Sequence, residues 1–321
     1  MRELVSAKTA LVPVGIVGAG RSRNGLGPFL AEFLEQEGFF VAGVSGRSFE
    51  RATTNAEAIG RKLGHEVTPF ASPAALCASG VAALVIASPA EFHLEALQAA
   101  IVAGLPALCE KPLVHEDDGK EGAEVIEGFA RKRLPLLENC QWPNVLPAFF
   151  QLHGPVETEE HPAVEMGLGP PRSGREMVQN TVSHLLSVIQ TVAPVDSGAV
   201  VSEVSIADPS YEQTRNLLRF RIAAAPGKTV EGLLHLEICA VSPRPAWLAI
   251  NGCRIDRHVR AGYAMVFSAN STEVSIADPM KELVKHFALL VRSRDSALMD
   301  NDRDRIRQRL KWYRQILEKL E

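Results

Sequence analysis

The chain has 321 residues, of which 46% are hydrophobic and 22% are charged, and its formal net charge is −4 at pH 7. This length allows two domains of ordinary size, the acidic balance argues against nucleic acid as a partner, and no apolar run approaches the roughly 20 residues that span a bilayer. Because the five cysteines are scattered without a CxxC pair, they are typical of reduced thiols, and we expect a cytoplasmic protein with no membrane partner, no disulfide framework and no metal site.

Short apolar runs alternate with helix-like segments over the first 140 residues. Such alternation is typical of βαβ units and predicts a doubly wound parallel sheet. The predicted strands are residues 11–17, 39–45, 82–87, 106–109 and 134–139, with a weaker strand near Val67. The predicted helices are residues 27–36, 49–63, 90–103 and 116–132.

The turn after the first strand is rich in glycine. Gly18 and Gly20 fit the first two positions of a dinucleotide-binding fingerprint, but the third falls on Arg23, so Gly25 must serve through a longer turn. Backbone amides of such a turn approach a pyrophosphate at a helix N-terminus, and Arg21 lies in the same turn. The alternative is a flexible βα loop with no ligand.

The end of the second strand predicts which nucleotide is preferred. An NAD site has an acid here for the ribose hydroxyls, whereas this chain has Ser45, Arg47 and Ser48. Arginine binds a phosphate through two parallel hydrogen bonds, so the sequence predicts NADP(H) in preference to NAD(H), which remains possible as a cofactor. The alternative is that Ser48 caps the next helix and Arg47 is a solvated surface residue.

Two further strand ends carry polar motifs. Ser88-Pro89 with His93 follows the strand at 82–87, and Glu110-Lys111-Pro112 follows the strand at 106–109. Since ligands bind outside the carboxyl ends of strands in open α/β sheets, Ser88, Pro89, His93, Glu110 and Lys111 are predicted to face one crevice and to contact the cofactor.

These motifs resemble the Gfo/Idh/MocA family, named after glucose-fructose oxidoreductase and inositol dehydrogenase. The resemblance covers most of the first 140 residues and is carried by residues 14–20, by 85–89 with His93, and by 103–112. It implies a Rossmann domain over residues 1–141, followed by an α+β domain with an open-faced, mainly antiparallel sheet over 142–321. It also implies oxidation of sugars, polyols or related alcohols with NAD or NADP, with Lys111 near the nicotinamide ribose and the reacting hydroxyl.

The resemblance extends to the second domain with two departures. Family members commonly carry an Asp-x-x-x-His pair on a helix; Asn180 and His184 match its spacing and are predicted to share one helical face, but the carboxylate is missing. Gln141 stands where the family often has arginine, and Trp142 follows it. His184 is predicted to act as general base and Trp142 to pack against a sugar; the alternatives are a polar interface histidine and a buried linker tryptophan.

Longer alternating strands follow Pro143. Leu218, Phe220 and Ile222 alternate with arginines, which suits a sheet with one buried and one polar face, and the exposed face suggests a homo-oligomer. The heptapeptide at 203–209 recurs at 273–279 and is interpreted as two similar strand-to-turn endings. Near the C-terminus six basic residues surround an apolar helical stripe and are interpreted as a solvated face: Arg303, Arg305, Arg307, Arg309, Lys311 and Arg314.

The leading hypothesis is an NADP(H)-preferring oxidoreductase acting on a secondary alcohol or its ketone in a small-molecule sugar or polyol. Lys111 would stabilise the alkoxide, His184 would move the hydroxyl proton, and Asn180 would orient either His184 or the substrate. Two alternatives are a catalytically impaired nucleotide-binding sensor or assembly protein, and a structural paralogue without cofactor. They are motivated by Asn180, Gln141 and the altered glycine turn.

Overall fold

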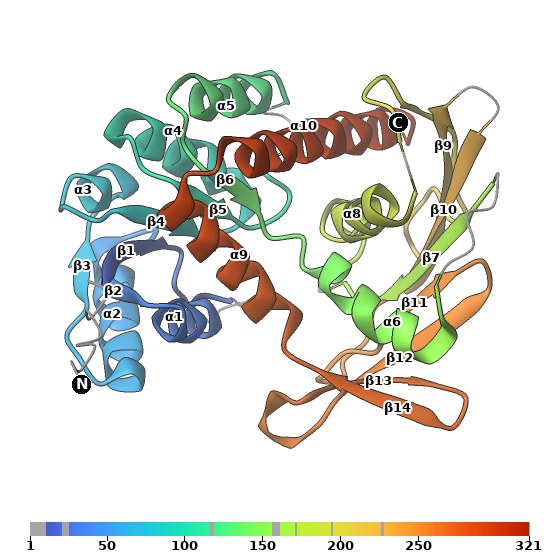
Figure 1. The fold of residues 1–321 in the computed structure, drawn as a ribbon, viewed down its shortest axis with the longest axis horizontal. Coiled ribbons are helices and arrows are strands. Elements are labelled where there is room, and N and C mark those ends of the chain that lie inside the picture. The colour runs from blue at the N-terminus through green and yellow to red at the C-terminus, as the bar shows by residue number, and fades with distance from the viewer. Residues whose placement is uncertain are drawn as a thin grey trace, which may run out of the picture. The chain divides into compact units, whose positions relative to one another are not determined.

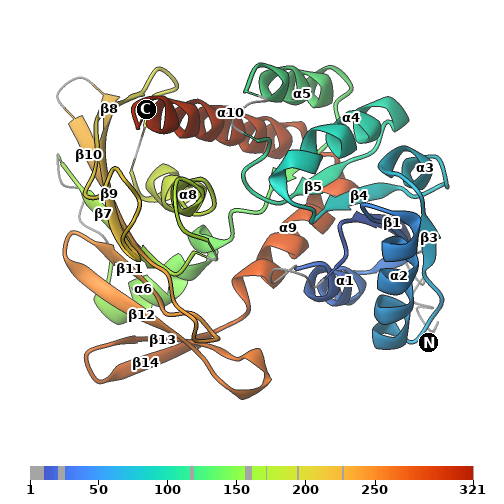
Figure 2. The same cartoon turned by 180° about the vertical axis from the view of Figure 1, so that it is seen from behind.

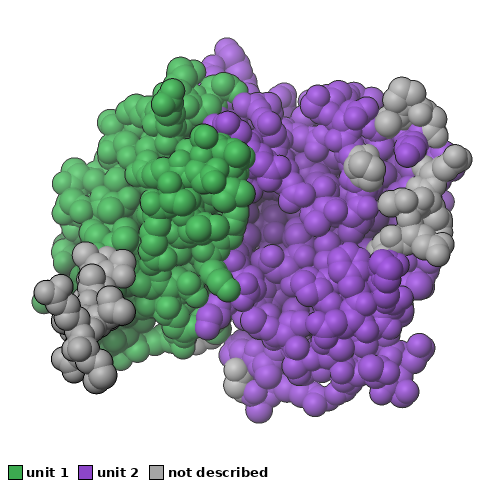
Figure 3. Space-filling model, in the orientation of Figure 1, with its two compact units in different colours: residues 1–109, 127–137, 284–299 green, residues 110–126, 138–283, 300–321 purple. Residues whose placement is uncertain are grey.

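The computed structural model describes residues 11–20, 26–115, 119–155, 161–170, 172–193, 195–225 and 228–320. The chain divides into two compact units, which Figure 3 colours separately. Unit 1 comprises Met1–Cys109, Glu127–Leu137 and Val284–Met299, and unit 2 comprises Glu110–Ile126, Glu138–Leu283 and Asp300–Glu321. A domain boundary at 141/142 stays a prediction. Two predicted cofactor-binding residues, Arg21 and Gly25, lie outside the described residues.

Six short strands form the first sheet: β1 (Val12–Val17), β2 (Phe39–Ser45), β3 (Thr68–Phe70), β4 (Ala83–Ile86), β5 (Ala107–Cys109) and β6 (Leu136–Glu138). Their order is β3-β2-β1-β4-β5-β6 (Figure 1), and β1 pairs in parallel with both β2 and β4. Val14, Ile16 and Val85 are fully buried, because helices on both sides leave such a sheet no polar face. The doubly wound parallel sheet is therefore confirmed.

The helices of this half are α1 (Gly27–Gln36), α2 (Phe49–Leu63), α3 (Pro73–Cys77), η2 (Ala90–Phe92) and α4 (His93–Ala103). In Figure 1, α1 and α2 lie below the sheet and α3 and α4 above it. The side chain of Ser48 caps α2 by accepting from the Arg51 amide at 3.3 Å, and Gly64 ends the helix with φ 82°, a left-handed conformation that glycine adopts readily. The five-residue α3 was not predicted, since it is too short to show a helical repeat.

Eight strands of unit 2 form the second sheet: β7 (Ala163–Leu168), β8 (Val200–Ile206), β9 (Arg215–Ala225), β10 (Lys228–Glu237), β11 (Ala246–Ile250), β12 (Cys253–Val259), β13 (Met265–Ala269) and β14 (Thr272–Ile276). Their order is β14-β13-β12-β11-β7-β10-β9-β8. Only the β7–β10 pair is parallel, so the predicted, mainly antiparallel sheet is confirmed. The two copies of the heptapeptide begin within the two edge strands, β8 and β14, and each strand ends at the isoleucine of the repeat. The interpretation as two similar strand-to-turn endings is therefore confirmed.

The remaining elements of the described chain are η4 (Trp142–Val145), α6 (Leu146–His153), α7 (Glu176–Gln179), α8 (Val182–Val192) and η5 (Ala261–Tyr263), together with α5 (Gly119–Arg131), α9 (Pro279–Ser293) and α10 (Ser296–Glu318), which contribute residues to both units. Helix α8 lies against one side of the second sheet, in contact with β7 and β10 (Figure 2). Within the described residues, no helix is both long and apolar enough to cross a membrane.

The prediction that one helix carries both Asn180 and His184 is wrong. Helix α7 ends at Gln179, and α8 begins at Val182 after Thr181, whose φ is −128°. The side chains of Asn180 and Thr181 donate to carbonyls one turn back, at Glu176 and Met177. Such side-chain bonds compete with helix propagation, which accounts for the break.

Candidate functional site

The turn after β1 lies where the strand order reverses, between β1 and β4. Ligands of open α/β sheets bind at the carboxyl ends of the strands at this switch point. Gly18 has φ 80°, its amide donates to the Ser45 carbonyl at 2.9 Å, and a Cβ at this position would collide with the backbone of Ser88. Only glycine therefore allows β1 and the turn after β4 to approach so closely.

The close packing expected from the third fingerprint glycine is made by Gly27. A Cβ on Gly27, the first residue of α1, would lie 2.6 Å from the Cα of Ala19. Gly25, which was predicted to serve as the third fingerprint glycine, lies outside the described residues, and Gly27 was not predicted to have this role. The missed signal was the spacing: a turn lengthened by several residues moves the helix-packing glycine to the first helical position. Gly20 is half-buried in the same turn.

Two buried hydroxyls at this edge have no hydrogen-bond partner among the described residues. They are the Oγ atoms of Ser45, the last residue of β2, and of Ser88, two residues after β4. Because buried polar groups are nearly always hydrogen-bonded, these unpaired hydroxyls at a switch point fit a polar ligand. With the glycine turn, they make this edge compatible with a dinucleotide.

The other predicted cofactor residues of unit 1 take distinct positions. His93 is buried, and its Nε2 donates to the Ser88 carbonyl at 2.8 Å, which fixes the Ser88-Pro89 turn. Arg47 is exposed, and its guanidinium carbon lies 5.6 Å from the ring centroid of Phe92. No carboxylate follows β2 directly, since residues 45–48 are Ser-Gly-Arg-Ser.

In unit 2, Lys111 is held by the main chain at the helix break. Its Nζ donates to the Asn180 carbonyl at 2.6 Å, the one hydrogen bond that the ammonium makes within the described part of the chain. The Asn180 side chain turns away and donates to the Glu176 carbonyl at 2.8 Å. The structure thus brings Lys111 and Asn180 together through the carbonyl of Asn180. A main-chain contact of this kind cannot be predicted from a side-chain motif.

His184 lies among positive charges. Burial and the charges of Lys111, Arg257 and Arg309 hold the pKa of His184 well below its usual value, so the imidazole is neutral near pH 7. Its Nδ1 is buried and has no hydrogen-bond partner in the described residues. A neutral ring with an open nitrogen can accept a proton or a hydrogen bond from a ligand.

Two glutamates line the same region. Asn139 donates to the Glu110 carboxyl; burial raises the pKa of Glu110, while the charge of Lys111 and the bond from Asn139 oppose this rise. Glu138 is 5% exposed and accepts from the Leu113 amide at 3.0 Å and from Arg309 Nε at 2.7 Å. Glu138 thus ties the Glu-Lys-Pro turn to α10.

The interpretation of the α10 basic residues as a solvated face is wrong for Arg303 and Arg309, which are 8% and 7% exposed. Arg309 pairs with Glu138 and also donates to Gln190 Oε1 on α8 at 2.7 Å. A buried cation needs such partners, and the partners lie far away in the sequence.

Gln141 and Trp142 follow this turn. Trp142 is 3% exposed, with the guanidinium carbon of Arg257 5.9 Å from its ring centroid. Gln141 is half-buried and precedes η4. Sequence reasoning missed Arg257, which lies 115 residues after Trp142 in an otherwise ordinary strand.

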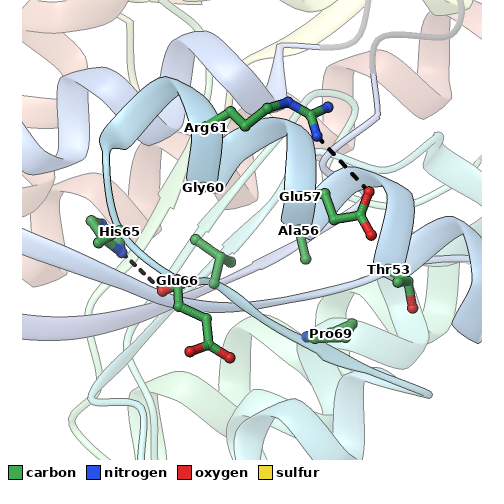
Figure 4. A pocket seen from close by; sticks show the side chains of 9 residues that line it. Thr53, Ala56, Glu57, Gly60, Arg61, His65, Glu66 and Pro69 are labelled. Carbon is green, nitrogen blue, oxygen red and sulfur yellow. Dashed lines mark hydrogen bonds and ion pairs between the residues drawn. The ribbon is translucent and has the colours of Figure 1, made fainter.

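A surface hollow elsewhere in unit 1 contains none of the predicted site residues. It is lined by α2 and by the segment that leads into β3, including Thr53, Gly60, His65 and Pro69 (Figure 4). Within it Arg61 lies 3.9 Å from Glu57, His65 Nδ1 donates to the Glu66 carbonyl at 2.9 Å, and His65 Nε2 pairs with Glu35 at 2.5 Å.

Comparison with protein families matches residues 12–138 to an oxidoreductase family with an NAD-binding Rossmann fold, GFO_IDH_MocA. An inositol 2-dehydrogenase from Streptomyces avermitilis is 39% identical over 123 residues, which are 38% of this chain and 33% of that protein. Another from Leifsonia xyli subsp. xyli is 51% identical over 53 residues, 16% of this chain and 15% of that protein. The chain therefore matches at most about a third of the length of these curated relatives.

Solved structures share the fold over nearly the whole chain. The UDP-N-acetylglucosamine 3-dehydrogenase GnnA from Acidithiobacillus ferrooxidans has a TM-score of 0.65 and 18% identity, covering 98% of this chain and 100% of that one. KijD10, a 3-ketoreductase from Actinomadura kijaniata in complex with NADP, has a TM-score of 0.64 and 17% identity, covering 93% and 95%. An oxidoreductase from Agrobacterium radiobacter in complex with NAD+, L-tartaric acid and magnesium has a TM-score of 0.62 and 14% identity, covering 96% of each chain.

The Glu138–Arg309 pair gives a stability prediction. Arg309→Met keeps the apolar stem but leaves the Glu138 carboxylate buried without its cation, so we expect the free energy of unfolding to fall by about 3–5 kcal/mol. Arg314→Met, on the same helix and 44% exposed beside Glu318, serves as control with an expected change of at most about 1 kcal/mol. Urea denaturation followed by circular dichroism measures both; equal losses would contradict the role given to Glu138.

Proposed function

We propose that this chain, of which residues 12–138 match the GFO_IDH_MocA oxidoreductase family, is a member of that family and an NAD(P)-dependent dehydrogenase or reductase. It would act on a secondary alcohol or ketone of a sugar, polyol or related compound. The observation that carries the proposal is the Lys111 ammonium, fixed 2.6 Å from the Asn180 carbonyl in a group of charges that keeps His184 neutral.

The residues that would hold the cofactor are those at the strand ends of unit 1. Gly18 and Gly20 admit the pyrophosphate to the backbone, and Ser45 and Ser88 offer hydroxyls that lack partners among the described residues. When bound, the nicotinamide supplies or accepts the hydride. Stabilisation of the charge on the substrate oxygen and transfer of its proton are then left to the side chains of the protein.

Lys111 has two N–H groups beyond the one it donates to Asn180, and we assign them to the substrate oxygen. An ammonium held in place before reaction stabilises the negative charge that develops when an alcohol loses its proton. His184 is assigned as the group that takes this proton through its open nitrogen. Asn180 is assigned a positioning role, since its carbonyl holds Lys111 and its amide group is bonded to its own helix.

The preference for NADP(H) rests on Arg47 and on the absence of an acid between residues 45 and 48. The solved relatives include one protein in complex with NADP and one with NAD+, so the fold accommodates either cofactor. The exposed Arg47 guanidinium beside Phe92 is available to a 2′-phosphate, while Ser48 caps α2.

A nucleotide-binding sensor or assembly protein without turnover is the second candidate. It is favoured by the amide in place of a carboxylate at Asn180, whose side chain is bonded to α7. Fluorescence titration with NADPH and NADH separates binders from non-binders, and a panel of sugars and polyols then separates an enzyme from a sensor.

Lys111→Ala tests the catalytic assignment. We expect the turnover number to fall by about 10²- to 10³-fold, as for loss of a donor to a developing oxyanion, while the NADPH dissociation constant changes by less than about threefold. Lys62→Ala, which removes a surface ion pair with Glu32, is the control and should behave as the wild type. Steady-state kinetics and fluorescence titration give the two numbers, and undiminished turnover would refute the role of Lys111.

Arg47→Asp tests the cofactor preference. Loss of the cation and the added repulsion should raise the NADPH dissociation constant by about 10- to 100-fold, with a change in the NADH constant below about threefold. Arg51→Asp makes the same charge change at an exposed position one turn along α2 and should affect neither. An unchanged NADPH constant in Arg47→Asp would be incompatible with 2′-phosphate binding by this residue.

We also assign the protein to the cytoplasm. Cys77 and Cys140 are buried and form no disulfide, and burial raises the pKa of Cys77 to about 11, which fits thiols kept reduced.

The exposed face of the second sheet is assigned to contact with a second copy of the chain. Trp247 lies on this face. Its ring centroid is 5.0 Å from that of His235 and 4.2 Å from the guanidinium carbon of Arg254. Sedimentation equilibrium should give about twice the chain mass of 34.8 kDa, and Trp247→Asp should shift it towards one chain, since a twofold interface uses the same patch twice. A wild-type monomer at working concentration would contradict the assignment.

A further inference from the structure

Arg257 is the one guanidinium of β12 that points to the buried side of the second sheet. Along this strand Ile255 is fully buried, while Arg254 and His258 are exposed. Since side chains alternate between the faces of a strand, Arg257 shares the side of Ile255. A charged group on that side requires a specific reason.

The contacts of Arg257 leave part of its donor capacity unused. Its Nη2 donates to the Arg244 carbonyl at 2.8 Å, and its guanidinium carbon lies 5.9 Å from the Trp142 ring centroid. Its Nε is buried and has no hydrogen-bond partner among the described residues. The distance to Trp142 is at the outer limit of a cation–π contact, so the unpaired Nε remains available for a hydrogen bond to a ligand.

No carboxylate of the described chain lies within 4.0 Å of the Arg257 guanidinium. Asp278 acts on it only at longer range and is committed to the start of α9, where it accepts from the Met280 amide at 2.8 Å. Glu138 is taken by Arg309, and Glu110 by Asn139. The cationic edge of Arg257 therefore has no anionic partner in contact.

Arg257 also belongs to the group around His184. The guanidinium lies beside Trp142, and Cys140, two residues earlier, donates its Sγ to the carbonyl of Ser183, next to His184, at 3.6 Å. The charges of Lys111, Arg257 and Arg309 all act on this imidazole. A neutral polyol has no group that would need the second cation. A substrate with its own negative charge would.

We propose that the substrate carries an anionic group, a carboxylate or a phosphate, close to the reacting carbinol carbon, and that Arg257 binds this group. The inference rests on the proposed function, because it names the class of substrate for the same site. Guanidinium binds both kinds of oxyanion through paired, charge-assisted hydrogen bonds. Lys111 then remains available for the alcohol oxygen.

Calorimetric titration of the NADP-loaded protein tests the proposal with matched ligands: D-glucitol as the neutral polyol, D-gluconate as the carboxylate, and D-glucitol 6-phosphate as the phosphate. We expect one of the anions to bind at least about tenfold more tightly than glucitol, and which anion does so identifies the source of the charge. Arg257→Met should weaken its binding by about 10- to 100-fold, and Arg257→Lys by less. Arg260→Met, an exposed residue directly after β12 that pairs with Glu273, should leave it unchanged.

Two results would overturn the proposal: neither anion binds more tightly than glucitol, or Arg257→Met binds the preferred anion as well as the wild type does. The melting temperature of each variant shows whether it is folded. A loss of anion binding in Arg257→Met counts as support only if this variant melts at the same temperature as the wild type and as Arg257→Lys, which retains the charge. Failure of the proposed function is read separately, as absence of NADPH and NADH binding in the preceding fluorescence titration. In that case the anion titration on the cofactor-free protein still reports on Arg257.

Discussion

The buried ion pair between Glu138 and Arg309 is the interaction on which the organisation of unit 2 depends. One carboxylate oxygen holds the Leu113 amide, and the other holds Arg309; Arg309 in turn binds Gln190 on α8. The Glu-Lys-Pro turn, α8 and α10 are thereby fixed to one another. Because Lys111 lies in this turn and His184 on α8, the same pair that stabilises the fold also fixes the two elements that carry these side chains.

The residues of the candidate site meet a different physical requirement in each unit. In unit 1 the requirement is steric: Gly18 lets the turn after β1 approach Ser88, and Gly27 lets α1 pack on Ala19, which leaves backbone amides and two hydroxyls at the strand ends. In unit 2 the requirement is electrostatic. Burial and nearby cations keep His184 neutral, and a ring that is neutral at pH 7 can accept a proton, whereas an imidazolium cannot.

Much of the fold could be predicted from the sequence because its signals are local. Apolar runs located β1, β2 and β4 to within a residue, and the alternation of Leu218, Phe220 and Ile222 gave the buried face of β9. What the sequence did not reveal depends on distant contacts. Arg309 lies 171 residues from Glu138, so a basic helix resembled a solvated one. Asn180 and His184 have helical spacing, but side-chain bonds to Glu176 and Met177 interrupt the helix between them. Arg257 carries no motif and becomes conspicuous only through its buried, unpaired Nε and its position beside Trp142.

The proposed negative charge on the substrate would account for both the amide at Asn180 and the cation at Arg257. A carboxylate at position 180 would add a negative charge at the helix break whose carbonyl holds Lys111, and it would repel an anionic ligand. An amide there leaves Lys111 free to bind the substrate oxygen and removes that repulsion. Arg257 then supplies the attraction that a negatively charged group requires on leaving water. On this reasoning the missing acid is a condition for binding an anionic substrate and is compatible with turnover, because neutral His184 remains to take the proton.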